Sequence, residues 1–548
     1  MSHDTPEAGT SGESPDGTHP DPTPPGADNS IPARQELSSR REGEALEDEV
    51  TEDEAAAHEL AVQAEHDRVA QELVASGLFA GPDPTVVDDV LASPDVPEVV
   101  DPTARAQADT EVHRIYTEIL SRAPEHDVQP SLERVRQVCE LLGDPQRAYP
   151  VIHIAGTNGK TSTARIAERL LREHGLRTGR FTSPHLSTVR ERIAIDGEPI
   201  SPEAFIATWE EVAPYIEVVD QRSRAEGGPR LSFFEVFVVL AFAAFADAPI
   251  DIAVLETGMG GRWDATNVAD GSVEILTPIS RDHERWLGHT LAEIAAEKVG
   301  ILTPGSTVVC AAQDDEVTPI VRDAAHALDA RLLVAGEDLE VVDRQLGVGG
   351  QMLVLRTPAA TYTDVFLPLH GSHQADNALL ALTAVETFLG GRAMAGDVVE
   401  QALAAVDSPG RLEVVRTSPT VLLDGAHNPA GVEVLRAAVD EAFQLSRLVG
   451  VVGVMADKNA EAILAELEPL LAEIVITRAG VDRAHDLEDL AEIARDVFDE
   501  ERVHVAERLD DAIDLAAARA EYGGQHGGGV LVTGSIILVG EARALLRG

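Results

Sequence analysis

A glycine-rich stretch at residues 151–163, VIHIAGTNGKTST, constrains the fold of this chain more than any other feature. Its first residues are mostly β-branched, as in a buried strand, and the residues after it carry apolar side chains at helical spacing. Gly156 and Gly159 let backbone N–H groups approach a polyphosphate closely. Lys160 adds a positive charge, and the hydroxyl of Thr161 can reach a magnesium ion. We therefore expect a strand, a phosphate-binding loop and a helix whose N-terminus faces the phosphates.

The loop is shorter than the usual phosphate loop, G-x-x-x-x-G-K-[ST], because only two residues separate its glycines. GTNGKT resembles the short ATP loop of the Mur ligase superfamily, whose members join an amino acid to a carboxylate with ATP. The resemblance implies that ATP contacts Gly156, Thr157, Asn158, Gly159, Lys160 and Thr161. Lys160 is expected on a solvent-facing part of the loop. The alternative is an ordinary strand-to-helix turn with an incidental lysine.

Composition narrows the class of protein. The chain has 548 residues, of which 44% are hydrophobic, enough for two or three domains with real cores. A formal net charge of -52 argues against nucleic acid as a partner, since phosphate backbones attract Lys and Arg. Cys139 and Cys310 match no metal-binding spacing, which suits a reducing cytoplasm. No secretory signal is visible, and the longest apolar run, residues 236–246, is too short to span a bilayer. We expect a cytoplasmic protein without a membrane partner.

The first 105 residues are expected to form a disordered acidic extension. The first fifty are rich in Pro, Gly, Ser, Asp and Glu and have few large apolar side chains to offset the entropy of ordering. Residues 51–80 are compatible with a helix, but the prolines from Pro82 to Pro102 interrupt any continuous element. A solvating tail is the simpler interpretation, and an acidic docking arm is the alternative.

Helical spacing of apolar residues predicts two helices before the phosphate loop, at residues 106–123 and 132–142. Ser131 precedes the second helix and suits its start. After the helix that follows the loop, a second short strand is expected at residues 177–182.

Residues 189–201 are interpreted as a strand with a turn at Asp196 and Gly197. Residues 231–246 are almost continuously apolar and predict a buried helix. Ser232 is the expected N-cap of this helix, and Glu235 completes a capping box with it.

A near-continuous apolar run at residues 250–255 predicts a buried parallel strand, and Glu256 follows directly at its carboxyl end. A carboxylate at this edge is placed like the acidic metal ligand of phosphate-loop enzymes, and it suits Mg2+. The sequence from Leu255 to Asn267, LETGMGGRWDATN, resembles the signature of the folylpolyglutamate synthases and dihydrofolate synthases. The chain is identified as a member of this family within the Mur ligase superfamily.

Two further segments resemble the same family. TSPHL is followed by an ERI run and a DG turn, and SRDHERWLGHTLAEIAAEKVGI carries the family's next motifs in the same order. The resemblance implies two Mg2+ ions held by Ser183, Glu256 and His283. It also implies that Lys298 carries a carbamate. Without the resemblance, Ser183 is a turn residue, His283 a structural histidine, and the lysine a solvated helix residue.

The resemblance also places a folate site. VQPSLER, residues 128–134, is similar to the family segment that touches the pterin end of the substrate, and SFFE, residues 232–235, to a segment of the folate pocket. The implied folate contacts are Val128, Gln129, Pro130, Ser232, Phe233, Phe234, Glu235, Arg262 and Asp264.

Three later segments complete the nucleotide site that the resemblance implies. HGSHQADNALLALTAVETFL is similar to a helix whose asparagine approaches adenine, SPGRLEVV to an interdomain hinge, and DGAHNP to a turn that holds the nucleotide. The implied ATP contacts are Asn377, Arg411, Asp424 and His427. Read alone, the Asp424-Gly425 pair is simply a good turn. The remaining sequence alternates strand and helix, which predicts a second doubly wound domain.

These patterns predict an α/β fold in three parts. Residues 1–105 form the disordered extension, and residues 106–408 form a phosphate-loop-type doubly wound domain that binds ATP and folate. Residues 409–548 form a smaller Rossmann-like C-terminal domain for glutamate ligation. The resemblance implies a monomeric ligase in which Lys160, His283 and Lys298 are catalytic.

Its substrates would be ATP, L-glutamate and a reduced folate or dihydropteroate, joined through an acyl phosphate. Family members that add the first glutamate to dihydropteroate carry the same motifs, so that activity stays open. The alternative is a cell-wall ligase of the Mur type acting on a UDP-linked substrate, which should lack LETGMGGRWDATN and SFFE.

Overall fold

The computed structural model describes residues 102–123, 129–522 and 527–547. The predicted disordered extension up to residue 101, the candidate helix at 51–80 and the candidate folate contact Val128 lie outside the described residues. The first described element is helix α3 (Pro102–Leu120), whose proline occupies a first-turn position that needs no backbone N–H. Among the described helices, none combines the length and the apolar character that a membrane span requires.

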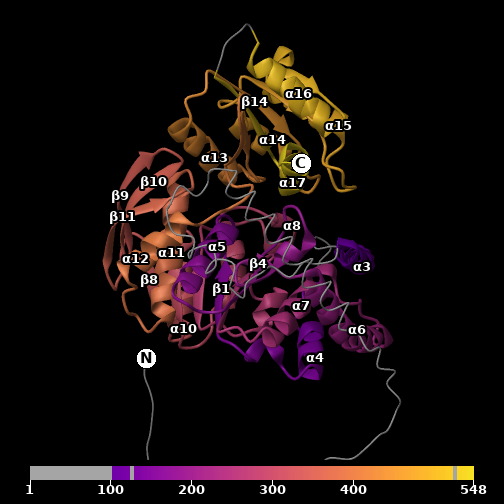
Figure 1. Ribbon diagram of the computed structural model, residues 1–548, viewed down its shortest axis with the longest axis vertical. Helices are drawn as coiled ribbons and strands as arrows, with labels where there is room; N and C mark the ends of the chain where they lie inside the picture. Colours follow the sequence, from indigo (N-terminus) through magenta and orange to yellow (C-terminus); the bar gives the residue numbers. More distant parts are fainter. Residues whose placement is uncertain (1–101, 124–128, 523–526, 548) are drawn as a thin grey trace, which may run out of the picture. The chain divides into compact units, whose positions relative to one another are not determined.

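An eight-stranded sheet forms the centre of the N-terminal module (Figure 1), in the order β4-β3-β2-β5-β1-β6-β7-β8. The strand of the phosphate loop, β1 (Val151–Ala155), lies between β5 (Ile252–Glu256) and β6 (Val273–Leu276) and is parallel to both. The other strands are β2 (Thr178–Phe181), β3 (Ile193–Ile195), β4 (Glu198–Pro199), β7 (Thr307–Cys310) and β8 (Arg331–Val334). Because parallel strands end at one edge, the loops after β1, β5 and β6 meet there.

One prediction for this sheet is wrong. Residues 189–201 are not a single strand: a 3-10 helix (Val189–Arg192) leads into the antiparallel hairpin of β3 and β4. The chain reverses at Asp196 and Gly197, whose φ angles are 50° and 86°. Two consecutive residues with positive φ are the geometry of a tight two-residue hairpin turn, so the predicted turn separates two strands.

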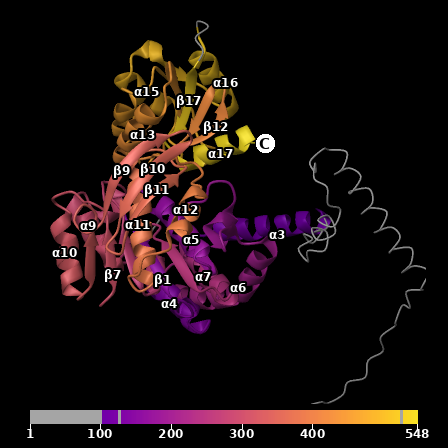
Figure 2. The ribbon, with the colours of Figure 1, turned by 60° about the vertical axis from the view of Figure 1, so that its left-hand side comes forward.

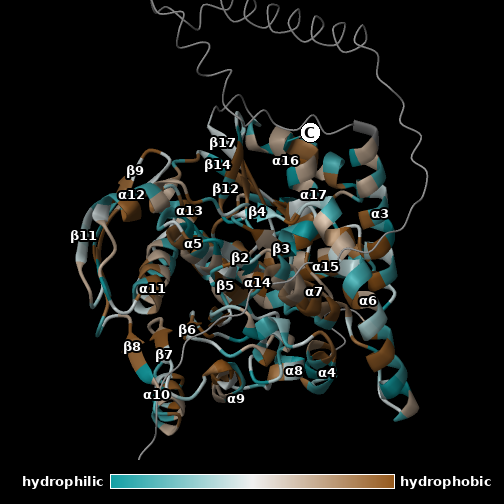
Figure 3. Cartoon of the chain, turned by 60° about the horizontal axis from the view of Figure 1, so that its bottom comes forward, coloured by the Kyte–Doolittle hydropathy of each residue, from teal (hydrophilic) through white to brown (hydrophobic). Residues whose placement is uncertain are grey.

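Helices cover both faces of the sheet. Ile152 and Ile154 of β1 pack in one core with α5 (Lys160–Glu173) and α11 (Ser372–Phe388), while Val151 packs in another with α7 (Phe233–Asp247). Alternate residues of a strand point to opposite faces, so both cores depend on this strand. Nearly every residue of α7 is buried, and Figure 3 shows its hydrophobic colouring. The helices around α7 are α3, α4 (Glu133–Leu141) and α6 (Pro202–Ala225).

A three-stranded antiparallel sheet that the sequence did not predict packs against α11 and α12 (Gly396–Ala404) (Figure 2). Its strands are β9 (Glu340–Gly347), β10 (Gly350–Arg356) and β11 (Thr361–Leu367). In the eight-stranded sheet, α8 (Glu284–Leu287) and α9 (Leu291–Lys298) lie in the connection from β6 to β7, and α10 (Thr318–Ala327) connects β7 to β8.

The C-terminal module is a second doubly wound α/β unit, as predicted. Its sheet has the order β12-β13-β17-β14-β15-β16, and only β12 is antiparallel to its neighbour. The strands are β12 (Glu413–Thr417), β13 (Thr420–Leu423), β14 (Arg447–Val452), β15 (Glu473–Ile476), β16 (Val503–Val505) and β17 (Gly528–Thr533). The helices are α13 (Pro429–Ala442), α14 (Ala460–Leu467), α15 (Leu487–Val497), α16 (Leu509–Ala520) and α17 (Ile536–Arg547). The predicted fold class is confirmed.

Candidate active site

The two glycines of the phosphate loop are required by close packing. Gly156 has a φ of 150°, and a Cβ there would lie 1.9 Å from Thr277 Oγ1 at the end of β6. Gly159 has a φ of 89° and precedes α5, and a Cβ there would lie 2.5 Å from Asn377 Oδ1 on α11. The loop is therefore pressed between a strand end and α11. This packing brings Asn377, a predicted ATP contact, directly against the loop.

Lys160 is the first residue of α5 and is half-buried, so the expectation of a solvent-facing position is wrong. Its Nζ donates to the carbonyl oxygens of Gly156 at 3.3 Å and Thr157 at 3.2 Å. Burial lowers the pKa of Lys160, although the charges of Glu256 and Asp282 oppose this shift. An ammonium held under a phosphate loop can neutralise charge on a bound polyphosphate.

Glu256 ends β5 beside this loop and is almost fully buried. Thr161 Oγ1 donates to its two oxygens at 2.9 and 3.0 Å, and the backbone N–H of Ser183 donates to Oε2 at 3.3 Å. Burial raises the pKa of Glu256, and the charge of Lys160 opposes that rise. A buried carboxylate is a hard oxygen ligand of the kind that suits Mg2+.

His283 lines the same cavity as Glu256 and Ser183. It precedes α8 with a φ of 52°, and burial lowers the pKa of its imidazole to about 3. The side chain is therefore neutral at physiological pH, which is the form that binds metals. Within the described ranges no group of three or more His, Cys, Asp or Glu side chains is arranged to hold a metal ion. The candidate ligands are one carboxylate, one hydroxyl and one imidazole, a set that fits Mg2+ when phosphate oxygens complete it.

Lys298 ends α9 and is only 4% exposed, so it is not a solvated helix lysine. Its Nζ donates to Gly156 O at 2.6 Å, which places the amine under the phosphate loop. Burial, reinforced by the charge of Lys160, lowers the pKa of Lys298 to about 7. A large share of its amine is then neutral near pH 7, as carbamate formation requires.

The C-terminal module contributes the other side of this cavity. Asp424 follows β13 and accepts hydrogen bonds from the backbone N–H groups of Leu412 and Ala426, both at 2.8 Å. Burial raises the pKa of Asp424. Arg411 lies so close to the turn that a Cβ on Gly425 would be 2.4 Å from its Nη1. The structure brings all ten predicted ATP contacts to one cavity, and their roles stay predictions.

Asp282 joins the two modules, and the sequence reasoning missed it. Lys458 Nζ lies 2.5 Å from Asp282 Oδ1, and Asn428 Nδ2 donates to Oδ2 at 3.1 Å. His427 Nε2 is 3.5 Å from Oδ2. Burial tends to raise the pKa of Asp282, but the hydrogen bond from His427 and the charge of Lys458 hold it well below its usual range. The available signal was the position of Lys458 after β14, at the carboxyl edge of a parallel sheet.

A second amide contact spans the modules at the phosphate loop itself. Asn158 Nδ2 donates to Asn428 Oδ1 at 3.2 Å, and Asn428 Nδ2 donates to Asn158 Oδ1 at 3.1 Å. Asn428 is also the N-cap of α13, where its Oδ1 accepts from Gly431 N at 2.8 Å. One asparagine thus fixes a helix start and contacts the loop.

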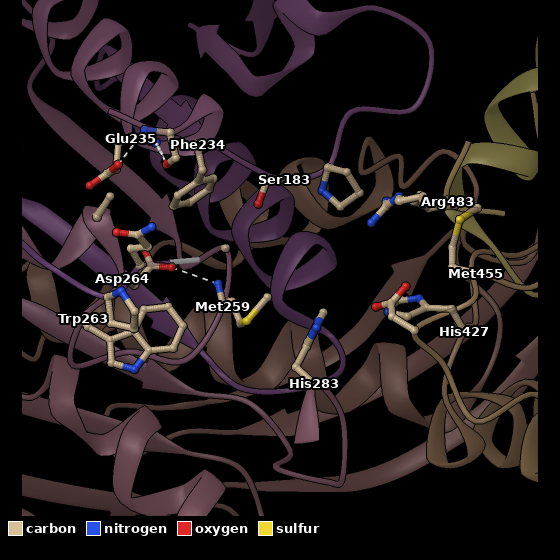
Figure 4. Close-up of a pocket in the computed structure, with 18 of the residues that line it drawn as sticks. Ser183, Phe234, Glu235, Met259, Trp263, Asp264, His283, His427, Met455 and Arg483 are labelled. Atoms are coloured by element: carbon tan, nitrogen blue, oxygen red, sulfur yellow. Dashed lines mark hydrogen bonds between the residues drawn. The ribbon is translucent and has the colours of Figure 1, made fainter. Parts of the chain in front are cut away.

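A second cavity adjoins the first and shares Ser183, Met259, His283 and His427 with it (Figure 4). Of the predicted folate contacts, it is lined by Gln129, Pro130, Ser232, Phe234, Glu235 and Asp264. The capping box at the start of α7 is confirmed: Ser232 Oγ accepts from Glu235 N at 3.2 Å, and Glu235 Oε2 accepts from Ser232 N at 2.7 Å. Ser131, in contrast, accepts from Glu133 N without occupying the N-cap of α4.

Two predicted folate contacts do not reach this cavity. Phe233 points into the core around α7, where its ring centroid is 4.8 Å from that of Phe237. Arg262 turns away along α9 and donates from Nη2 to Ala296 O at 3.0 Å. Their sequence neighbours Phe234 and Trp263 line the cavity instead.

Residues of the C-terminal module line the opposite wall of the second cavity. Met455, Lys458 and Arg483 do so, and Figure 4 shows Met455 and Arg483 across the cavity from Phe234 and Asp264. Arg483 was not predicted. Its position on an irregular loop between β15 and α15 carries no sequence pattern that indicates a site.

Comparisons with known proteins bear on both modules. Residues 231–385 match the model of the Mur ligase middle domain, and residues 410–536 match that of the Mur ligase, glutamate ligase domain. A dihydrofolate synthase/folylpolyglutamate synthase of Mycobacterium tuberculosis is 48% identical over 447 residues, which covers 77% of this chain and 91% of that protein.

Solved structures agree with these matches. A Mycobacterium tuberculosis folylpolyglutamate synthase complexed with ADP and AMPPCP superposes with a TM-score of 0.77 at 45% identity, over 80% of this chain and 99% of that one. An Escherichia coli FolC in complex with DHPP and ADP superposes with a TM-score of 0.68 at 27% identity, over 80% of this chain and 97% of that one.

Proposed function

The chain belongs to the dihydrofolate synthase/folylpolyglutamate synthase family of the Mur ligase superfamily, and we propose that it uses ATP to join L-glutamate to the carboxylate of a reduced folate. The observation that carries this proposal is the shared wall of the two cavities. Ser183, Met259 and His283 line both the cavity that contains the phosphate loop and the cavity that contains SFFE and Asp264. A nucleotide in the first and a folate in the second would meet at that wall.

The proposed chemistry has two steps. A folate carboxylate oxygen attacks the γ-phosphorus of ATP, the bond from that phosphorus to the β,γ-bridging oxygen breaks, and ADP leaves. The amino group of glutamate then attacks the acyl phosphate, phosphate leaves, the nitrogen loses a proton, and an amide remains. Lys160 and Arg411 both line the first cavity, and we propose that they neutralise the charge that moves to the departing oxygens.

Magnesium is the cofactor that the donor set supports. We propose that Ser183, Glu256 and His283 hold two Mg2+ ions together with phosphate oxygens, and that the ions act as Lewis acids toward the transferring phosphoryl group. Lys298 would carry a carbamate beside them, since its buried amine is near the loop and its pKa is lowered to about 7. The carbamate exchanges a cation for an anion, which a site rich in metal and phosphate favours.

Arg483 supports a place for L-glutamate. Its guanidinium lines the second cavity from the C-terminal module, and no hydrogen-bond or ion-pair partner within the described residues competes for it. Guanidinium groups bind carboxylates in a bidentate manner. We propose that Arg483 binds a carboxylate of the incoming glutamate. Lys458, which also lines this wall, is already paired with Asp282.

Phosphate release by the purified protein tests the function. Tetrahydrofolate, dihydropteroate and a UDP-muramyl substrate are each supplied with ATP and Mg2+, with and without glutamate. We expect glutamate-dependent release with tetrahydrofolate, and release with dihydropteroate if the first glutamate is also added. Release with the UDP-linked substrate alone would establish the cell-wall alternative. An Arg483→Gln variant should raise the KM for glutamate and leave that for ATP unchanged.

The setting of the enzyme is also a proposal. Both cysteines are buried and unpaired, which suits a reducing cytoplasm. The ten predicted ATP contacts and six of the predicted folate contacts line cavities of this one chain, which supports action as a monomer. Sedimentation of the active protein would test that state.

A further inference from the structure

A histidine lies in the middle of β1, a strand whose five residues are all buried. His153 is the third residue of β1, has no exposed surface, and is flanked in sequence by Ile152 and Ile154. Its backbone partners are Leu255 on β5 and Glu274 on β6. A polar side chain in such a place costs free energy unless it is hydrogen-bonded, so its partner is informative.

The partner is a threonine of the signature loop. His153 Nε2 lies 2.9 Å from Thr266 Oγ1, and Nδ1 has no hydrogen-bond partner within the described residues. Thr266 Oγ1 lies 2.6 Å from Asp264 Oδ1, to which it donates. The three side chains therefore form a series of two hydrogen bonds from the central strand to the carboxylate of Asp264.

The protons available on His153 and Thr266 decide which group donates in each of these two hydrogen bonds. Burial lowers the pKa of His153 to about 3, so its ring is neutral and has a single N–H. The only proton of the Thr266 hydroxyl is given to Asp264, so the oxygen must accept from the ring. The imidazole proton is thereby assigned to Nε2, and both hydrogen bonds polarise toward the carboxylate.

Asp264 is the end of this series that faces the second cavity. The carboxylate is 2% exposed and accepts also from Thr266 N at 3.0 Å on Oδ1 and from Met259 N at 2.9 Å on Oδ2. Figure 4 shows it beside Met259 and Trp263, and the cavity there also contains Phe234. Burial raises the pKa of Asp264 to about 6, and the hydrogen bond from Thr266 opposes this rise.

We propose that His153 is a positioning residue for the folate substrate: through Thr266 it fixes the orientation and the ionised state in which Asp264 accepts hydrogen bonds from N–H groups of the folate ring. The inference rests on the proposed function, because it takes the second cavity as the folate site. It adds a residue that no folate atom touches and that stands on the strand leading into the phosphate loop.

Other ionisable groups act on Asp264 or share its cavity, and they also contribute to the pH dependence of activity. The charges of Lys160 and Lys298 interact with Asp264. The ionisable side chains that line the same cavity are Arg134, Glu235, His283, His427, Asp457, Lys458 and Arg483. None of them contacts His153 or Thr266 in the described part of the chain, so substitutions at these two positions leave the others in place.

Paired substitutions test the inference. Thr266→Val keeps the shape and removes the hydroxyl, whereas Thr266→Ser keeps the hydroxyl. His153→Phe keeps a planar ring and removes the donor, and His153→Gln keeps an N–H near the Nε2 position. We expect Thr266→Val to raise the KM for folate about tenfold, because a hydrogen bond to a charged group is lost, with the KM for ATP changed less than about twofold. Thr266→Ser and His153→Gln should stay near wild type.

Two further measurements distinguish positioning from mere structural support. The acid limb of kcat/KM for folate should move to higher pH in Thr266→Val and His153→Phe, because a carboxylate with fewer donors has a higher pKa. Because the histidine acts through the threonine, the double variant should be no worse for folate than Thr266→Val alone. Quenching of tryptophan fluorescence by folate, reported by Trp263 in the cavity, gives the affinity without turnover.

The outcomes separate the inference from the function. Wild-type protein without folate-dependent phosphate release would overturn both. Active wild-type protein with folded variants whose folate KM and acid limb are unchanged would overturn the role of His153 alone. Should His153→Phe fail to fold, as judged by its melting transition, the contrast between Thr266→Val and Thr266→Ser still decides. Equal losses in the KM for ATP and for folate would show a structural role and overturn the inference.

Discussion

Lys298 Nζ donates a hydrogen bond to the carbonyl oxygen of Gly156 at 2.6 Å, although 142 residues separate the two in the chain. The amine that is the candidate for carbamate formation is thus tied to the first glycine of the phosphate loop. A carbamate keeps one N–H, so the proposed modification is compatible with this hydrogen bond.

Turnover should depend on Lys298 in a way that carbon dioxide modulates. Because the pKa of Lys298 is lowered to about 7, the neutral amine that reacts with carbon dioxide predominates above that pH and falls roughly tenfold for each unit below it. Activity at pH 6 should therefore rise when bicarbonate is added, and activity at pH 8 should change little. Phosphate release at matched ionic strength measures this.

Substitution of the same lysine gives an independent check. Lys298→Ala should be slow and partly rescued by a short carboxylic acid that fills the vacated space. Lys298→Arg keeps the charge but forms no such carbamate, so it should be inactive and unrescued. Near-normal turnover of Lys298→Arg would contradict the carbamate role.

Lys160→Met should lower turnover about 100-fold or more, since it removes a cation placed for the transferring phosphoryl group. The charged Lys160 side chain should also reduce the stability of the folded protein without substrate. Because burial lowers the pKa of Lys160, its charged form is disfavoured in the folded protein at every pH below that folded value. The melting temperature at pH 7 should therefore be unchanged or higher. A clear loss of stability would show that the cation is already paired without substrate.

Glu256→Gln should raise the Mg2+ concentration for half-maximal activity about tenfold, and more than it raises the KM for glutamate. The amide keeps the hydrogen bonds to Thr161 and Ser183 within reach but loses the charge that holds a hard cation. Initial rates across a magnesium titration at saturating ATP measure this. The reverse order of effects would place Glu256 in the amino-acid site.

Lys458→Met should destabilise the protein by about 3 kcal/mol, because it leaves the buried carboxylate of Asp282 without its ammonium partner. Asp282→Asn on the same background should recover part of that loss. Urea unfolding gives both values, and the exposed pair of Arg508 and Asp510 is a matched control in which Arg508→Gln should cost less than about 0.5 kcal/mol. Equal costs at the two pairs would contradict the buried contact.

The same pair fixes a pH dependence. The pKa of Asp282 is held well below its usual range, so its contribution to stability is complete above about pH 4 and is lost only as the pH falls through the lower folded value. Unfolding of the wild type between pH 5 and 8 should show no transition that Asp282→Asn removes.

The sequence predicted those parts of the fold in which local pattern and tertiary position agree. Strand β5 and helix α7 are almost continuously apolar, and β1 is apolar except for His153, because both faces of each are buried. Strand β9 escaped prediction because most of its residues are exposed and polar, so it shows neither alternation nor an apolar run. The hairpin at Asp196 was missed even though its turn was recognised, since the strand was continued through it.

The sequence predicted which residues form the site, but it predicted only part of how their side chains are arranged. Motifs placed Glu256 and Asp424 at the carboxyl ends of strands, and Lys298 reaches the same cavity from the end of helix α9. The motifs do not indicate the direction in which a side chain points, so Phe233 was assigned to a cavity from which it points away. The contact between Asp282 and Lys458 spans 176 residues and two modules, which no local pattern can reveal.

The reciprocal amide contact between Asn158 and Asn428 has a thermodynamic consequence. One of its partners belongs to the loop that is expected to wrap the nucleotide phosphates, and the other starts a helix of the C-terminal module. Linkage makes this coupling reciprocal. If a bound nucleotide changes the free energy of the Asn158–Asn428 contact, then altering the contact from the C-terminal module changes the affinity for that nucleotide by the same factor. Resistance of the C-terminal module to proteolysis is therefore a gauge of nucleotide affinity, and loosening that module with a distant substitution should weaken ATP binding without touching the phosphate loop.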